Sequence, residues 1–145
     1  MSKTTDALHL DQQLCFSVYS TSLAMTQAYK PLLEDLGITY PQYLAMLVLW
    51  EQDGLTVKAL ADRLGQDSGS LTPIVKRLEA EGYLARNRDP KDERNLAVTL
   101  TPQGRALRTR GQKVNQAFAK ACGMTTSELA ELRASLQKVR DRLKG

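Results

Sequence analysis

The sequence predicts a mainly α-helical fold, a winged helix-turn-helix with long helices at both ends of the chain. Apolar residues recur at helical spacing from Leu8 to Leu36 and again after Thr101, which predicts the end helices. Between these segments, two short helical patterns meet at Gly65, and two stretches of alternating apolar and polar residues follow. Helix, turn, helix and β-hairpin in this order are the layout of a winged helix-turn-helix.

Size and composition narrow the classes of protein that fit this chain. Its 145 residues, 42% of them hydrophobic, suit one domain or one subunit of a symmetric assembly. A net charge of +4 favours polyanionic partners without being diagnostic. The N-terminus lacks the apolar core of a signal peptide, and no apolar run reaches the length of a membrane span. We therefore expect a cytoplasmic protein without membrane association.

The two cysteines, Cys15 and Cys122, do not suggest a metal site. They form no CxxC motif and no zinc-type spacing with the single histidine, His9. A disulfide scaffold needs more cysteines in a smaller chain. We expect neither a metal nor a cofactor, and thiols that stay reduced until an oxidant reaches them.

Side-chain caps predict where the central helices start. Thr39 and Gln42 form a capping-box pair for a helix that runs through Trp50. That helix is apolar nearly all round, so we expect it to be central. Two short helices follow this one. Thr56 is predicted to cap the first and Gly65 to end it, and Asp67 and Ser68 can cap the second.

The predicted wing is a charged β-hairpin. Residues 84–88 and 96–100 alternate as strands do, and residues 89–93 have the composition of a turn. We expect arginines at the tip of this ribbon, Arg86 and Arg94 among them, to suit the narrow minor groove of DNA. Asp92, on the same strand face as Arg94, is placed to orient its guanidinium group. A solvated turn of mixed charge is the alternative.

The second of the two short helices carries the residues expected to contact double-stranded DNA. Small and hydroxyl residues at its N-terminus can approach phosphates, helped by free backbone N–H groups. Its basic residues can reach phosphates or base edges. The face opposite its apolar side holds Ser68, Gly69, Ser70, Thr72, Pro73, Lys76 and Arg77.

The last helix carries a heptad-type seam. Its apolar residues are spaced 3, 4, 3 and 4 apart: Leu129, Leu132, Leu136, Val139 and Leu143. We expect residues 1–37 and 101–145 to be dimerisation helices around a DNA-binding lobe of residues 39–100, all within one domain of residues 1–145. A purely intrachain helix pair is the alternative to a homodimer.

Cys15 is a candidate redox sensor, although a lone cysteine is commonly an inert packing residue. Tyr19, four residues on, can lie beside it on the same helix. Tyr29 lies about 21 Å farther along a straight helix, so only a chain reversal or a second chain brings the two together. We expect Cys15 about two turns into its helix, where the helix dipole has little effect.

The segment from Leu60 to Gly104 resembles the MarR family of bacterial regulators. It reads LADRLGQDSGSLTPIVKRLEAEGYLARNRDPKDERNLAVTLTPQG, and its specific features are LEAEGYLAR, DPKDER and LTPQG in this order. Cys15, Tyr29, Tyr40 and the stretch DSGSLTP are similar to the organic-hydroperoxide sensor subgroup, OhrR. The resemblance implies a homodimeric repressor of a palindromic operator, not an enzyme.

The same resemblance implies roles for the cysteines and tyrosines. Cys15 corresponds to the peroxide-reactive residue, and Tyr29 and Tyr40 to tyrosines that hydrogen-bond it from the partner subunit. Cys122 matches approximately a second cysteine that resolves the oxidised thiol across the dimer, as in the two-cysteine members. The expected cycle runs from Cys15 sulfenic acid to a disulfide with Cys122 or a small thiol, and then to release of DNA.

Other interpretations of the sequence stay open. A repressor released by a small phenolic ligand would make Cys15 structural. A thiol peroxidase would need an activating arginine or histidine near Cys15, and the sequence offers none nearby. Cys122 could be a small packing residue under Phe118.

Overall fold

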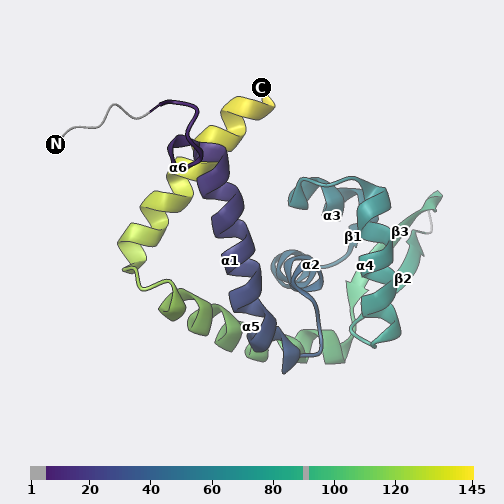
Figure 1. The fold of residues 1–145 in the computed structure, drawn as a ribbon. Coiled ribbons are helices and arrows are strands. Elements are labelled where there is room, and N and C mark those ends of the chain that lie inside the picture. Colours follow the sequence, from purple (N-terminus) through teal and green to yellow (C-terminus); the bar gives the residue numbers. More distant parts are fainter. Residues whose placement is uncertain (1–5, 90–91) are drawn as a thin grey trace.

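Helix α2 (Tyr40–Glu51) is the central element of the computed structural model, which describes residues 6–89 and 92–145, without the side chains of residues 88–95. Figure 1 shows α2 end-on, between helix α1 on one side and helices α3 and α4 on the other. The bounds of the other helices are η1 Leu10–Gln12 (a 3-10 turn), α1 Leu14–Glu34, α3 Val57–Leu64, α4 Ser68–Ala80, α5 Pro102–Ala121 and α6 Thr126–Lys144.

A small antiparallel sheet completes the lobe around α2. Its strands are β1 (Leu55–Thr56), β2 (Leu84–Asp89) and β3 (Asp92–Leu100), in the order β1-β3-β2. The β2–β3 hairpin is the predicted wing, and Leu84 pairs with Leu100 at its base. The predicted mainly helical, winged helix-turn-helix class is confirmed. The two-residue strand β1 was not predicted, because so short a segment shows no alternation.

Local capping explains where the helices begin. Thr39 Oγ1 accepts a hydrogen bond from the Gln42 backbone N–H, and Gln42 Oε1 accepts one from the Thr39 backbone N–H. Thr125 and Glu128 form the same reciprocal pair at the start of α6. Gly65 ends α3 with a φ of 68°, in the left-handed region that favours glycine. These signals act within a few residues, so the sequence shows them directly.

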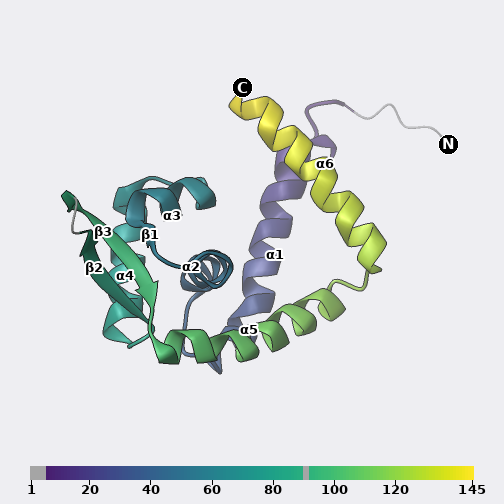
Figure 2. The same cartoon turned by 180° about the vertical axis from the view of Figure 1, so that it is seen from behind.

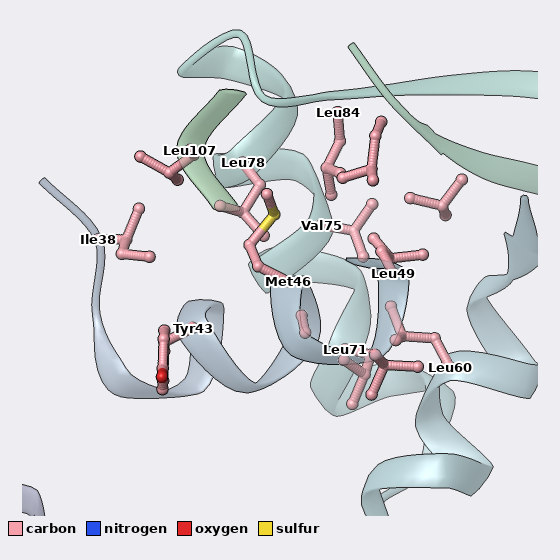
Figure 3. Close-up of a cluster of buried hydrophobic side chains, with 14 of the residues drawn as sticks. Ile38, Tyr43, Met46, Leu49, Leu60, Leu71, Val75, Leu78, Leu84 and Leu107 are labelled. Atoms are coloured by element: carbon pink, nitrogen blue, oxygen red, sulfur yellow. The ribbon is translucent and has the colours of Figure 1, made fainter. Parts of the chain in front are cut away.

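The core lies between α2, α3, α4 and the sheet, and it includes Leu33 of α1 and Leu107 of α5. Figure 3 shows Met46 and Leu49 of α2 in the same cluster as Leu71 and Val75 of α4. Helix α2 has buried residues on several of its sides, which explains why its sequence is apolar nearly all round. The core therefore fixes α4 and the wing relative to α2.

Helix α5 joins this lobe to the end helices, and α2 packs closely against it at Gly111, which has no side chain. Trp50 Nε1 donates a hydrogen bond of 2.9 Å to the carbonyl of Gly104. The Trp50 ring lies over Gly111, where a Cβ atom would come within 2.7 Å of two ring carbons. Gly111 is therefore needed for this close approach of the two helices, whereas a Cβ atom at Gly104 would meet the Tyr83 carbonyl and not α2.

The end helices form an open frame beside the lobe. In both views α6 crosses α1 near the N-terminal end of α1 (Figures 1 and 2). Within the described part of the chain, α6 has no buried residue. No described helix is long and apolar enough to cross a membrane.

We expect Gly111→Ala to destabilise the fold, although alanine favours a helix interior over glycine by about 1 kcal/mol. The added methyl group would overlap the rigid Trp50 ring, and such overpacking costs about 1–3 kcal/mol. Urea unfolding followed by Trp50 fluorescence measures the change. Gln112→Ala, at the exposed neighbouring position, is the matched control. A Gly111→Ala protein more stable than wild type would contradict the packing described here.

Candidate functional site

The N-terminal turn of α4 presents the small residues predicted to face DNA. Ser68, Gly69 and Ser70 are exposed, as are Pro73, Lys76 and Arg77 farther along the helix, while Thr72 is half-buried. Asp67 Oδ1 accepts a hydrogen bond of 2.8 Å from the Ser70 N–H. One of the expected free N–H groups is therefore occupied, and a carboxylate stands where a phosphate was expected to approach.

Two of the predicted contact side chains on α4 already have partners within the chain. The Thr72 hydroxyl donates a hydrogen bond of 2.9 Å to the Ser68 carbonyl. Arg77 Nε lies 3.4 Å from Glu81 Oε1, one turn away, with the arginine side chain 74% exposed. An exposed pair of this kind is weak, so Arg77 can exchange Glu81 for another anion. Lys76 is exposed on the same face.

Arg86 does not lie at the tip of the wing. It pairs with Val98 in the middle of the hairpin, whereas the last cross-strand pair before the tip is Asp89 with Asp92. Its guanidinium donates to Glu79 Oε1 from Nε at 3.1 Å and from Nη2 at 2.9 Å. Its backbone N–H donates to Glu79 Oε2 at 3.2 Å. These hydrogen bonds hold the pKa of the Glu79 carboxyl below its usual range.

The expected pairing of Asp92 with Arg94 lies outside the described side chains. Both residues belong to β3, so their backbones are part of the hairpin. Their roles at the tip of the wing stay predictions from the sequence.

Cys15 is exposed and lies in the first turn of α1, not two turns into the helix as expected. The helix starts late because Gln13 is extended and its side chain donates hydrogen bonds to the carbonyls of Ala7 and His9. The unpaired N–H groups and the dipole at a helix N-terminus favour a negative charge there. Cys15 therefore lies nearer the positive end of the helix dipole than the sequence indicated.

A groove of about 920 Å³ between α1 and α6 contains Cys15. Tyr19 lines the same groove, as its spacing of four residues from Cys15 predicted. The apolar part of the lining comes from both helices and includes Leu14, Val18, Leu136, Val139 and Leu143. The predicted seam of α6 therefore borders the candidate sensor residue.

Tyr29 and Tyr40 belong to an aromatic cluster. Their ring centroids are 5.0 Å apart, and Tyr29 stacks on Phe118 of α5 at 4.1 Å. Tyr43 of α2 is 5.6 Å from Tyr29 and was not predicted as part of the site. Its position one turn after Tyr40 was the signal that could have found it.

Cys122 lies at the end of α5 beside this cluster, where its backbone N–H donates to the carbonyl of Phe118 at 3.1 Å. Burial, and then the nearby Tyr43, Tyr40 and Cys122, raise the pKa of Tyr29 well above its ordinary value. Burial likewise raises the pKa of Tyr40. The two phenols are therefore firmly protonated hydrogen-bond donors at neutral pH.

The chain keeps Cys15 apart from the cluster. Cys15 and Tyr29 lie on one continuous helix, α1, and their separation of 14 positions corresponds to about 21 Å. Tyr29, Tyr40 and Cys122 thus come together in one place, and Cys15 and Tyr19 in another. Among residues 6–89 and 92–145, no group of three or more histidines, cysteines or acidic residues could hold a metal ion.

Comparison with known proteins identifies the family. A model described as the MarR family matches residues 38–96. The organic hydroperoxide resistance transcriptional regulator of Bacillus subtilis is 41% identical over 94% of this chain and 92% of its own length. The chain belongs to the MarR family. The regulator TtmR of Methylorubrum extorquens is 46% identical over 99% of this chain and 74% of its own length.

Solved structures of AbfR, a protein of Staphylococcus epidermidis, support membership of the OhrR subgroup within that family. Reduced AbfR bound to DNA matches with a TM-score of 0.80 at 35% identity, over 93% of this chain and 92% of that chain. Disulfide-formed AbfR matches with a TM-score of 0.64 at 37% identity, over 93% and 90%. This MarR-family chain is a transcriptional regulator of the OhrR type.

We expect the raised pKa of Tyr29 to make folding stability fall as pH rises above about 10, the ordinary value. The unfolded chain loses this proton near that pH while the folded chain keeps it, so ionisation favours unfolding. Urea unfolding at two alkaline pH values measures the slope, which Tyr29→Phe should reduce. Tyr19→Phe removes an exposed phenol outside the cluster and is the control. Equal slopes for wild type and Tyr29→Phe would contradict the assignment.

Proposed function

We propose that this chain is a homodimeric repressor that binds double-stranded DNA when reduced and releases it when an organic hydroperoxide oxidises Cys15. One observation carries the proposal: each subunit holds an exposed thiol in an apolar groove and, elsewhere, a cluster of phenols with a second thiol. Two copies can bring the thiol of one subunit to the cluster of the other.

The exposed apolar residues of the end helices favour pairing with a second copy. Leu132, Leu136, Val139 and Leu143 of α6 are 39–82% exposed, and Leu14, Val18 and Leu23 of α1 are 45–58% exposed. An intrachain helix pair, the alternative, would have buried the α6 seam. Apolar area of this extent on one side of a soluble chain is typical of a subunit interface.

DNA binding would use α4 in the major groove and the wing in the minor groove. The exposed Lys76 and Arg77 and the small residues at the start of α4 are the proposed contacts of the helix, with Arg94 at the wing. AbfR, which has the same fold, was solved bound to DNA in its reduced form. A dimer would place two such helices on the half-sites of a palindromic operator.

The proposed chemistry starts from the Cys15 thiolate. Its sulfur attacks the terminal oxygen of the hydroperoxide, the O–O bond breaks, and the alkoxide leaves as an alcohol after taking a proton. The product is a sulfenic acid. The partner's Cys122 thiol then attacks the oxidised sulfur, an S–S bond forms, and water leaves. Apolar neighbours such as Leu14 and Val18 favour an organic hydroperoxide over hydrogen peroxide.

Release of DNA would follow because the partner's Tyr29 and Tyr40 lose their anionic acceptor and the helices repack. The AbfR structures support a change of shape on disulfide formation in that protein, although overoxidised AbfR was also solved bound to DNA. At similar identities, this chain matches reduced AbfR on DNA better than disulfide-formed AbfR, with TM-scores of 0.80 and 0.64. A coupling of about 3 kcal/mol would weaken DNA binding about 150-fold.

Cys15→Ser should bind DNA like the reduced wild type but keep binding it after treatment with cumene hydroperoxide, because no sulfur remains to oxidise. Fluorescence anisotropy with a duplex selected by the wild-type protein from a random library measures release. Cys122→Ser should still respond but give no disulfide-linked dimer in non-reducing mass analysis. Release of DNA from oxidised Cys15→Ser would show that Cys15 is not the sensor.

Lys76→Ala and Arg94→Ala should each weaken DNA binding and lower the slope of log K against log salt by about 0.9, since one phosphate contact is lost. Lys120→Ala, which removes an exposed cation from the far end of α5, is the matched control. An unchanged slope for Lys76→Ala would remove that residue from the proposed interface.

A further inference from the structure

We propose that Glu79 and Arg86 are positioning residues for DNA binding, and that their ion pair fixes the angle between helix α4 and the wing. The inference rests on the proposed DNA-binding function and concerns residues that would not touch DNA themselves. The pair joins Glu79, near the C-terminal end of α4, to the middle of strand β2.

The side chain of Arg86 faces inward. Leu84, two residues earlier on β2, is 2% exposed, and alternate residues of a strand share one face. Val98, the cross-strand partner of Arg86, is fully buried on that same face. The guanidinium therefore points toward α4 and away from the surface that the wing would offer to a groove.

The pair is held by more than one point contact. Both Glu79 oxygens are used, Oε1 by the guanidinium Nε and Nη2 and Oε2 by the Arg86 backbone N–H. The forked guanidinium fixes orientation as well as distance. The backbone hydrogen bond also satisfies an N–H on β2, an edge strand of the sheet.

The position of the pair suits it to set an angle. Leu78 of α4 and Leu84 of β2 are buried at the base, where the short connection through Gly82 joins the two elements. The Glu79–Arg86 pair lies two residues farther toward the tip than Leu84. A tie at this point limits how far the hairpin can swing about its base, and the proposed contacts at the tip move most with such a swing.

Stability and DNA specificity should respond differently. The Arg86 and Glu79 side chains are 27% and 35% exposed, and ion pairs with access to solvent contribute little to folding. Loss of the pair should therefore leave the fold intact. It should affect sequences that need helix and wing contacts at once more than non-specific DNA, which tolerates many poses.

The test compares two duplexes, one selected from a random library by the wild-type protein and one scrambled to the same composition. Glu79→Ala and Arg86→Ala should each lower the ratio of selected to scrambled affinity about tenfold. The double variant should lose no more than either single one, because all three lack the same pair. Glu51→Ala, which breaks the exposed Glu51–Arg63 pair in the same lobe, should keep the wild-type ratio.

If Arg86 contacted a phosphate directly, the variants would change DNA affinity in a different direction. In that case Glu79→Ala would free the guanidinium and maintain or raise affinity, and Arg86→Lys would keep most of it. The positioning role predicts a loss in Glu79→Ala and little rescue by lysine, which lacks the fork. A retained ratio in Glu79→Ala, or additive losses in the double variant, would overturn the proposal.

Two controls keep these outcomes separable. Urea unfolding of each variant checks the fold, and Glu79→Gln, which keeps the side-chain shape and one acceptor oxygen, replaces Glu79→Ala if that variant unfolds. It should show a smaller loss of the same kind. If the wild-type protein enriches no sequence and binds neither duplex, the proposed DNA-binding function fails and the positioning role falls with it.

Discussion

The contact of Trp50 with the glycine-bearing face of α5 is the constraint on which the rest of the structure depends. Because Gly111 carries no side chain, α2 can lie close to α5, and the indole N–H and the Tyr43 hydroxyl both donate to carbonyls of α5. The core holds α4 and the wing to α2, so this contact joins α5 to the whole lobe. Tyr29 packs on Tyr43 and Phe118, which connects the aromatic cluster to the same contact. Close-packed interiors transmit displacement, so a shift of Tyr29 would reach the contact between α2 and α5.

Local signals allowed much of the fold to be predicted. The pairs Thr39–Gln42 and Thr125–Glu128 act across three residues, so their hydrogen bonds could be inferred from the letters alone. The start of α1 could not be inferred in this way. Apolar periodicity continues through Leu10 and Leu14, whereas the 3-10 turn and the extended Gln13 break the helix between them. That break moves Cys15 into the first turn.

The candidate site was less accessible to sequence reasoning because its parts meet only through tertiary packing. Composition suggested a turn over residues 89–93, but β3 already begins at Asp92, and the register sets Arg86 inside the hairpin. Its partner Glu79 lies seven residues away on another element, and nothing in the sequence marks the two as a pair. Tyr43 is marked in the sequence only by its place one turn after Tyr40, and its contact with Tyr29 of α1 comes from tertiary packing.

Because the groove beside Cys15 is open, the proposed sensor needs two subunits. On a lone chain the Cys15 side chain is exposed, and Tyr29 of the same subunit lies about 21 Å away along α1. If the partner subunit completes the surroundings of Cys15, protein concentration governs how many Cys15 thiols can react with oxidant. At low concentration the population shifts to single chains. Dilution alone would then weaken the response to oxidant. The amount of regulator in a cell would therefore set the oxidant concentration at which it responds.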